Sequence, residues 1–286
     1  MTPDITATLI FHREAALAIP ALDSFQLMVD AARAHGLIVQ TQAMLDRPDP
    51  ATAHIIGTCT DRLDRVEEFD FGDLGLTRNA GVQRADGRFL AFFDGDDLWG
   101  SDWLHAAHAN AIAAEQPDDA VWHPAWLYYF AESDFDRHVT GITPHPEAKS
   151  FTASQQASTD LDFDRRLLAL DNLWTANVFA SRALHLRFPY SAVDPACGFG
   201  IEDWSWNIAT VMAGIQHRIV PETVHLIRQK DTGSLGTRNA AEGLLPHLPP
   251  GLFWPSDQAT HGQAPYDQDP GDQDPGDQDP GDQDRV

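Results

Sequence analysis

The chain has 286 residues and carries 43 acidic against 19 basic side chains, a formal net charge of −24 at pH 7. With 43% hydrophobic and 22% charged residues its composition is that of a globular protein, and its length suits one large domain or two small ones. The acidity argues against a protein that binds nucleic-acid phosphates or anionic lipid, because both need a basic surface.

The cell compartment is predicted from what the sequence does not contain. No stretch approaches the roughly 18 apolar residues of a membrane-spanning helix, and the start MTPDITATLIFHRE lacks the basic residues and long apolar run of a secretory signal. Cys59 and Cys197 are too few for a disulfide framework. We expect a cytoplasmic protein without a transmembrane segment, a form that still permits peripheral membrane association.

The first part of the chain alternates strand-like and helix-like patterns. Strands are predicted over Ile5–Phe11, Leu37–Leu45, Arg65–Phe69 and Arg88–Phe93, and helices over Glu14–His35, Ala51–Cys59, Leu74–Ala85 and Ser101–Glu115. This alternation predicts βαβ units and a mostly parallel central sheet flanked by helices, an α/β fold.

The pattern is less regular beyond residue 116. Strands are predicted over Ala120–Phe130, Thr175–Phe179 and His217–Ile227, and helices over Phe163–Leu170 and Ile201–Gly214. Residues 131–160 are polar with little periodicity. No firm domain boundary is visible before about residue 250, so we expect one domain over residues 1–250.

The carboxyl terminus is a five-residue repeat. From Asp267 the sequence reads DQDPG three times and then DQDRV. With no hydrophobic residue before Val286, it cannot bury enough apolar surface to offset the entropy cost of ordering. We expect residues 251–286 to form a disordered acidic tail, with cation binding by its aspartates as the alternative.

Polar clusters follow three of the predicted strands. His12-Arg13-Glu14 follows the first strand, Asp46 the second, and Asp94–Asp97 the fourth. Because ligands bind at the carboxyl ends of strands in open α/β sheets, these clusters are expected to converge on one rim.

The acidic cluster has the spacing of a cation site. Asp94 and Asp96 are two residues apart at the end of an apolar strand, with Gly95 between them to allow close backbone approach. Mg²⁺ or Mn²⁺ held by one or two carboxylates completes its shell with water and substrate phosphates. The alternative is that Asp96 or Asp97 caps the next helix.

The segment AGVQRADGRFLAFFDGDDLWGSDWL resembles the central block of the family 2 glycosyltransferases, inverting enzymes with the GT-A nucleotide-sugar fold. Arg78-Asn79-Ala80-Gly81 matches the family's Arg-Asn-x-Gly helix, and Asp94-Gly95-Asp96-Asp97 its Asp-x-Asp-Asp motif (DxD motif). The resemblance extends over residues 5–240 in short blocks. It implies a single GT-A-like, Rossmann-like domain with a nucleotide-sugar half over residues 1–115 and an acceptor half over 116–250. Asp94 and Asp96 would hold Mg²⁺ or Mn²⁺ against the donor diphosphate.

The resemblance also implies a donor site. The family's first strand ends beside the nucleoside, where this chain has Phe11-His12-Arg13-Glu14, and its second ends in Asp-Asp-Gly-Ser, where this chain has Asp46-Arg47-Pro48-Asp49. The expected nucleotide-sugar-binding residues are Phe11, His12, Arg13, Glu14, Asp46, Arg78, Asn79, Asp94 and Gly95. Because the second loop departs from the family, UDP as the nucleotide rests on the family alone. Arg13, Glu14 and Asp49 could instead begin helices.

The segment CGFGIEDWSWN places Glu202 and Asp203 at the start of an aromatic helix. Inverting transfer needs a carboxylate to take the acceptor hydroxyl proton, and a metal to offset the charge of the leaving diphosphate. The family's Glu-Asp pair uses its Asp as base, which implies Asp203. Glu202 would orient the acceptor and Trp204 would stack on a sugar ring. The alternative is an acidic pair favoured by the helix dipole.

The segment VHLIRQKDTGSL resembles the part that closes the donor site in many relatives. His225 is a candidate third metal ligand, or a structural histidine, and Arg228 a candidate diphosphate contact.

The expected function is metal-dependent, inverting transfer of a sugar from a nucleotide-diphosphate donor. The acceptor would be a hydroxyl of a saccharide, a lipid-linked saccharide or a cell-surface polymer, as in polysaccharide biosynthesis. A nucleotidyltransferase is the alternative enzyme, but the segment after the first strand lacks the glycines that such enzymes carry. A non-catalytic nucleotide-sugar binder is a third interpretation, which the intact acidic motifs disfavour.

Overall fold

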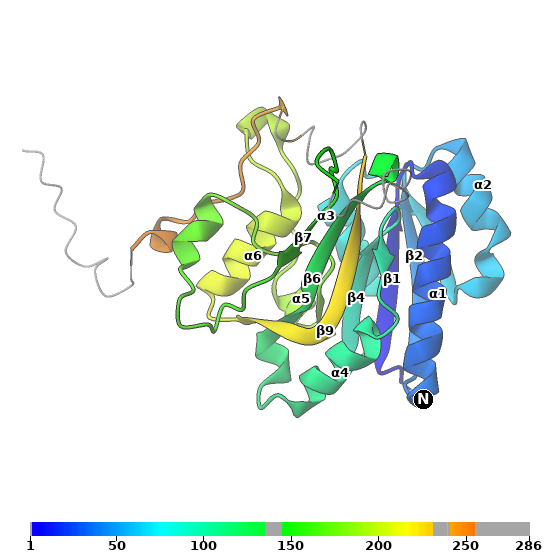
Figure 1. Cartoon of the computed structure of the whole chain (residues 1–286), viewed down its shortest axis with the longest axis horizontal. Helices are drawn as coiled ribbons and strands as arrows, with labels where there is room; N and C mark the ends of the chain where they lie inside the picture. Colours follow the sequence, from blue (N-terminus) through cyan, green and yellow to red (C-terminus); the bar gives the residue numbers. More distant parts are fainter. Residues whose placement is uncertain (1, 135–144, 231–238, 240, 255–286) are drawn as a thin grey trace, which may run out of the picture.

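The computed structural model describes residues 2–134, 145–230, 239 and 241–254. Within these residues, nine strands form one sheet in the order β3-β2-β1-β4-β8-β6-β9-β5, with β7 paired to β6 (Figure 1). The strands are β1 (Ile5–Phe11), β2 (Val39–Asp46), β3 (Arg65–Phe69), β4 (Phe89–Asp94), β5 (Leu98–Trp99), β6 (Ala120–Ala131), β7 (Phe151–Ser154), β8 (Phe179–Ser181) and β9 (Gln216–Gln229). The α-helices are α1 (Ala18–Ala34), α2 (Pro50–Thr58), α3 (Leu74–Arg84), α4 (Trp103–Ala113), α5 (Arg182–Arg187) and α6 (Glu202–Met212).

The core lies on both faces of the sheet, because alternate strand residues point to opposite sides. In β4, Phe89 and Phe93 join the cluster formed with α1 and α4, whereas Leu90 and Phe92 pack with α3 and α5 on the other face. β1 is buried at every position. Burial on both faces explains why these strands have continuous apolar sequences.

The pairing of strands is parallel in the first part of the sheet and mixed in the second. β1 pairs in parallel with β2 and β4, and β2 with β3. β6 and β9 are also parallel, with a bulge between Pro124 and Trp126. β8 and β5 join the sheet antiparallel, as does the edge strand β7. The α/β architecture predicted from the sequence is confirmed, with β5, β7 and β8 added to the sheet as antiparallel strands.

Helix α1 is long and apolar, and its buried side chains pack in the core. The segment Ala15–Ala34 is, among the described residues, a helix long and apolar enough by composition to cross a membrane, which the sequence analysis did not expect. Its buried side chains, Ala18, Leu22, Phe25, Met28, Val29 and Ala32, pack in the core cluster beneath the sheet. We therefore interpret it as a core helix.

The ends of two N-terminal helices have clear local causes. Asp49 caps α2 by accepting a hydrogen bond from the Thr52 amide at 2.8 Å, and Pro50 occupies the first turn. The helix-start interpretation of Asp49 is therefore confirmed. Gly36 follows α1 with a φ of +85°, a conformation that favours glycine.

The second part of the chain departs from the predicted elements. The segment predicted as a helix over Phe163–Leu170 is a short 3-10 turn at Arg165–Ala169, and the strand predicted at Thr175–Phe179 instead occupies Phe179–Ser181. The edge strand β7 and the short helix α5 were not predicted. β7 has mostly exposed residues, so it lacks the buried pattern that marks a strand in the sequence.

The folded chain continues beyond the predicted boundary at residue 250. Leu252, in the 3-10 turn Pro250–Leu252, is fully buried against Leu168, Trp174 and Ile208. The predicted tail therefore begins too early. The DQDPG repeats lie outside the described residues.

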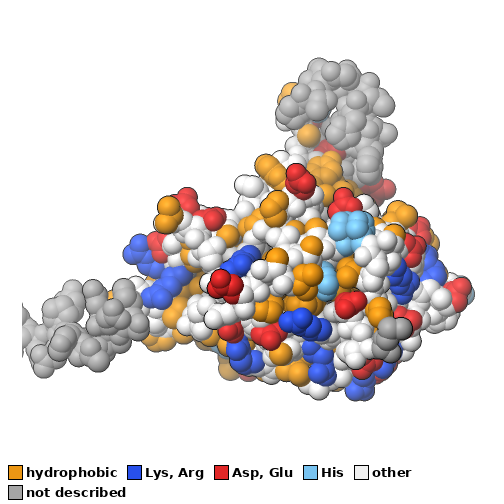
Figure 2. All heavy atoms as spheres, turned by 90° about the horizontal axis from the view of Figure 1, so that it is seen from below, with side chains coloured by type: hydrophobic (Ala, Val, Ile, Leu, Met, Phe, Trp, Pro, Cys, Tyr) orange, Lys and Arg blue, Asp and Glu red, His pale blue; other side chains and the backbone are white. Residues whose placement is uncertain are grey.

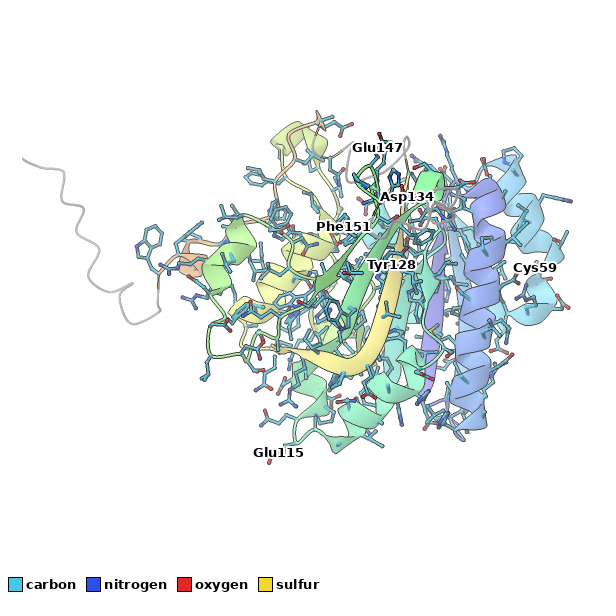
Figure 3. All side chains as sticks on the ribbon, viewed as in Figure 1. Cys59, Glu115, Tyr128, Asp134, Glu147 and Phe151 are labelled. Atoms are coloured by element: carbon cyan, nitrogen blue, oxygen red, sulfur yellow. The ribbon has the colours of Figure 1, made fainter. Side chains whose placement is uncertain are left out.

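On the face shown in Figure 2, acidic and basic side chains are interspersed with apolar ones. Cys59, beside α2 in Figure 3, and Cys197 are both free thiols.

Candidate active site

A cavity of about 910 Å³ lies at the carboxyl ends of β1, β2 and β4. The polar clusters of all three strands reach it, so the predicted convergence is confirmed. Its polar lining comprises His12, Glu14, Asp46, Asp73, Arg78, Asp94, Asp96, Asp97, Asn172, Glu202, Asp203, Arg228, Lys230 and Asn239, and its other lining includes Phe11, Gly95, Ile201 and Trp204. The carboxylates after β4 therefore share one space with those that begin α6.

Gly95 is required by the approach of β4 to β1. Its amide donates a hydrogen bond to the Ile10 carbonyl at 2.9 Å. A Cβ atom added there would lie 2.2 Å from the Phe11 ring. Any side chain at this position would displace Phe11 and with it the acidic loop.

Each carboxylate after β4 has a different protein partner. Asp94 Oδ1 accepts a hydrogen bond from Arg78 Nη2 at 2.9 Å, and Asp96 Oδ2 forms an ion pair with Lys230. Asp97 lies 2.9 Å from both His225 Nε2 and the Arg228 amide. Neither Asp96 nor Asp97 caps α4, so the alternative interpretation of the cluster as a helix cap is not what the structure shows.

His225 does not reach the acidic loop as a free ligand. Its side chain is 1% exposed, and Nε2 lies within 3.0 Å of both Asp97 and the Asn177 amide. The ring also stacks on Trp99. Because Nε2 already has protein partners, this arrangement favours the structural alternative for His225, and its role as a metal ligand stays a prediction.

Asp94 and Asp96 fit a hard divalent cation, with no third protein ligand among the described residues. Their side chains are 32% and 20% exposed, and each has one carboxylate oxygen outside the ion pairs described. No group of three or more His, Cys, Asp or Glu side chains among the described residues could hold a metal. Such a donor set suits Mg²⁺ or Mn²⁺, which take the rest of their shell from water and phosphate.

Asp46 shapes the cavity wall. Its carboxylate accepts hydrogen bonds from the amides of Phe71, Gly72 and Asp73, all at 2.9 Å, and the His12 ring lies against its carbonyl oxygen. Because both oxygens are engaged, Asp46 fixes the loop that precedes α3.

Asp73 is a cavity residue that the sequence analysis missed. Its Oδ1 caps α3 at the Leu76 amide, 2.8 Å away, and its Oδ2 accepts from the Val193 amide at 2.7 Å. Its place just before the predicted helix was the available signal. Asp73 connects the two halves of the cavity wall.

Arg78 lies beneath the acidic groups and is fully buried. Besides Asp94, its guanidinium lies 3.7 Å from Glu202 and packs over the Phe92 ring. Burial and the neighbouring Asp203 charge raise the pKa of Glu202 to about 8. Glu202 is therefore largely protonated near neutral pH.

Asn79 and Arg13 do not line the cavity, contrary to expectation. The Asn79 side chain donates to the Tyr190 carbonyl at 2.8 Å and accepts from the Tyr190 amide at 2.9 Å. These two hydrogen bonds use both ends of the Asn79 side-chain amide and fix the loop that contains Tyr190. Arg13 is exposed to solvent.

Asp203 is held by both oxygens at the start of α6. Oδ2 accepts a hydrogen bond from Asn172 at 2.8 Å, and Oδ1 accepts from the Trp204 amide at 2.8 Å. Asn207 Nδ2 in turn donates to the side-chain oxygen Oδ1 of Asn172 at 2.9 Å. Burial raises the pKa of Asp203, which makes it a stronger base than an ordinary aspartate.

Backbone strain precedes this pair, since Ile201 has a φ of +55°. A β-branched residue rarely adopts the left-handed region, and such strain gathers at functional sites.

Trp204 is oriented at the cavity edge. Its indole nitrogen donates to the Leu168 carbonyl at 2.7 Å, and its side chain is partly buried. This bond fixes the plane of a ring that lines the cavity.

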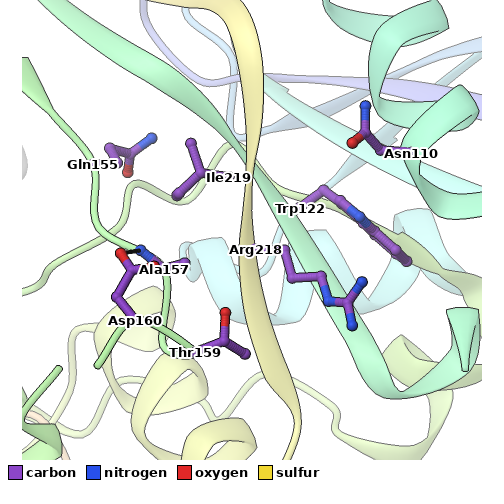
Figure 4. Close-up of a pocket in the computed structure, with 8 residues that line it drawn as sticks. All are labelled: Asn110, Trp122, Gln155, Ala157, Thr159, Asp160, Arg218 and Ile219. Carbon is purple, nitrogen blue, oxygen red and sulfur yellow. Dashed lines mark hydrogen bonds between the residues drawn. The ribbon is translucent and has the colours of Figure 1, made fainter. Parts of the chain in front are cut away.

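A second pocket of about 420 Å³ lies elsewhere on the fold (Figure 4). It is lined by Asn110, Trp122, Gln155, Ala157, Thr159, Asp160, Arg218 and Ile219. It contains one carboxylate and none of the predicted site residues, so the larger cavity is the candidate active site.

No family model and no curated protein matches this sequence. Solved structures match its fold. S. aureus TarS in complex with UDP-GlcNAc is 13% identical over 81% of this chain and 60% of that chain, with a TM-score of 0.53. S. aureus TarS in complex with UDP is 14% identical over 79% of this chain and 61% of that chain, with a TM-score of 0.51.

A third similar structure is GalNAc-T7 with UDP, GalNAc and Mn²⁺. It is 11% identical over 80% of this chain and 44% of that chain, with a TM-score of 0.54. This chain thus spans less than two thirds of the length of these solved chains. At such identities the likeness shows the fold alone, and it confirms the predicted GT-A fold.

Proposed function

We propose that the protein is a nucleotide-sugar glycosyltransferase that transfers a sugar with inversion from a nucleotide-diphosphate donor to an acceptor hydroxyl. The observation that carries this proposal is the meeting of two acidic groups in one cavity: Asp94 and Asp96 after β4, and Glu202 and Asp203 at the start of α6. The buried Arg78 lies between them, within 2.9 Å of Asp94 and 3.7 Å of Glu202. The cavity therefore provides carboxylates for a metal–diphosphate group and for an acceptor proton.

UDP is the proposed donor nucleotide, and Mg²⁺ or Mn²⁺ the proposed metal. Proteins of the same fold have been solved with UDP, UDP-GlcNAc and Mn²⁺. The cavity of about 910 Å³ is in the range of small-molecule sites. Asp94 and Asp96 would hold the cation, which when bound supplies positive charge to the leaving diphosphate.

Asp203 is the proposed general base. As the acceptor oxygen forms its bond to the anomeric carbon, the bond from that carbon to the diphosphate oxygen breaks, and the hydroxyl proton passes to Asp203. Asn172 and the Trp204 amide keep the carboxylate oriented for this step. Glu202, protonated because of its raised pKa, can donate a hydrogen bond to the acceptor. Trp204 would stack on a sugar ring.

The proposed acceptor is a hydroxyl of a saccharide, a lipid-linked saccharide or a cell-surface polymer. A cytoplasmic location and a part in polysaccharide biosynthesis rest on the sequence alone.

The test is a thermal-unfolding series with UDP, GDP, CDP and ADP, each with and without Mn²⁺. A ligand present at about 100 times its Kd stabilises the folded state by about 2.7 kcal/mol. That corresponds to a rise in the midpoint of roughly 5–10 °C for a domain of this size. We expect the rise with UDP and Mn²⁺, and its loss in Asp96→Ala. No rise with any nucleotide would overturn the proposal.

A further inference from the structure

Asp96, one of the two proposed metal ligands, already has a cation of the chain beside it. The Lys230 ammonium forms an ion pair with Asp96 Oδ2, and both side chains are largely buried, at 24% and 20% exposure. Lys230 directly follows β9 and lines the cavity. No sequence pattern predicted a role for Lys230.

The backbone that carries Lys230 is fixed to the acidic loop by several contacts. The Arg228 amide donates to Asp97 Oδ1 at 2.9 Å, and Arg228 Nε donates to the Asp96 carbonyl at 3.0 Å. The Arg228 guanidinium also packs 4.8 Å from the centre of the Phe130 ring. These contacts hold the end of β9 against the loop, so the Lys230–Asp96 pair is part of a built site.

The charges at the loop leave Lys230 as the main partner of Asp96. Asp94 pairs with Arg78, and Asp97 with His225. A divalent cation and an ammonium group repel each other at contact distance. The two therefore compete for the charge of the Asp96 carboxylate, and a cation on its other oxygen drives Lys230 toward another anion. A donor diphosphate offers that anion through charge-assisted hydrogen bonds.

We propose that Lys230 is an exchangeable counter-ion: it occupies Asp96 before the donor binds, and moves to the donor diphosphate when the divalent cation takes its place. This inference rests on the proposed function. It requires the metal alone to bind weakly, because Lys230 repels it. It also requires the metal and the nucleotide to strengthen each other's binding, because the diphosphate pairs with Lys230 and the metal releases Lys230 from Asp96. The same lysine would then weaken binding of free metal and strengthen binding of the diphosphate.

The test measures Mn²⁺ and UDP binding separately in wild type and Lys230→Gln. Free Mn²⁺ is followed by electron paramagnetic resonance, and UDP by titration calorimetry in metal-free buffer. We expect Lys230→Gln to bind Mn²⁺ alone about tenfold more tightly and UDP alone about tenfold more weakly, the change that about 1.4 kcal/mol produces. Arg166→Gln removes a positive charge from an exposed ion pair outside the cavity and should change neither affinity.

An Asp96→Ala background separates this effect from Mn²⁺ bound by other aspartates of the chain. There, adding Lys230→Gln should give no gain in Mn²⁺ affinity. Mn²⁺ affinity in Lys230→Gln that equals or falls below wild type would overturn the proposal. Absence of UDP binding by wild type with Mn²⁺ would instead contradict the proposed function, while the measurement with Mn²⁺ alone would still report on the Lys230–Asp96 pair.

Discussion

The two walls of the cavity are built in different ways. One wall is the end of the parallel strands β1, β2 and β4, whose buried apolar residues pack on both faces of the sheet. The other wall is made of loops and the start of α6. Polar side chains hold it in place: Asn79 bonds to the backbone of Tyr190, and Asn172 bonds to the Asp203 carboxylate. Tyr128 and Phe151, labelled in Figure 3, belong to neighbouring strands on this second side of the molecule.

The difference teaches where single substitutions should matter. Stability in the first wall is shared among many apolar contacts, each contributing a small part. In the second wall one amide or guanidinium often satisfies several buried groups, so its removal leaves them without partners. Substitutions at such polar groups therefore test whether the two walls differ in this way.

The largest effect is expected at Arg78, which joins the two walls. Breaking a buried ion pair by removing one partner typically costs 3–5 kcal/mol, so we expect Arg78→Met to lower the free energy of unfolding by about 3 kcal/mol. Arg84→Met on the same helix is the matched control, because the Arg84–Glu67 pair is exposed to solvent and should contribute less than about 1 kcal/mol. Equal losses in urea denaturation would contradict the bridging role of Arg78.

A smaller loss is expected for Asn79→Ala. It leaves the amide and carbonyl of Tyr190 without their side-chain partner and should cost about 1–3 kcal/mol, measured by denaturant unfolding. Asn110→Ala, whose side chain bonds only within an exposed helix turn, is the control. If Asn79→Ala weakens UDP binding and leaves the unfolding midpoint unchanged, Asn79 is a nucleotide contact, as the family resemblance implied.

The same contrast decides what the sequence could predict. The parallel strands were predicted closely, with β1 and β3 at their observed bounds. For β1 and β4 the reason is burial on both faces, which makes a strand a short continuous apolar run. The prediction that their polar ends lie at one rim was also correct, since Asp46, Asp94 and Asp96 line one cavity. Helical spacing likewise located α3 and α6 to within two residues.

The second wall could not be predicted in this way. Lys230 and Asn172 join the cavity through partners 134 and 31 residues away along the chain, and no periodic pattern encodes such contacts. The contacts of His225 could not be predicted for the same reason, since its neighbours Asp97 and Asn177 are distant in sequence. Asn79 was placed at the nucleotide by a motif, whereas its partner Tyr190 is visible only in the fold.

A pH-dependent effect is expected from Glu202. Burial raises its pKa from 4.5 to about 8, so between these values the folded protein retains a proton that the unfolded chain has lost. The stability that Glu202 contributes is therefore complete below pH 4.5 and lost as the pH rises toward 8. Thermal midpoints of wild type should fall with rising pH across this window, and those of Glu202→Gln should fall less. Parallel curves would contradict the raised pKa.

The smallest effect is expected at His185, a buried residue of α5. Burial lowers its pKa to about 3, and neither ring nitrogen has a hydrogen-bond partner among the described residues. The unfolded chain therefore binds a proton below pH 6.5 that the folded chain excludes, and stability falls as the pH drops. His185→Phe should keep the stacking on Trp206 and Tyr190 and unfold less readily than wild type at pH 4.5. At pH 8 the two midpoints should agree within a few degrees; a larger advantage at pH 8 would contradict this.

The central claim is that Asp203 takes the acceptor proton in a nucleotide-sugar site. The most direct test compares UDP binding with UDP release from a panel of UDP-sugars, water serving as acceptor, in wild type, Asp203→Asn and the exposed control Asp171→Asn. We predict that Asp203→Asn binds UDP and Mn²⁺ as wild type does and releases UDP at least about 100-fold more slowly, the usual contribution of a general base. UDP release by Asp203→Asn at the wild-type rate would contradict the account.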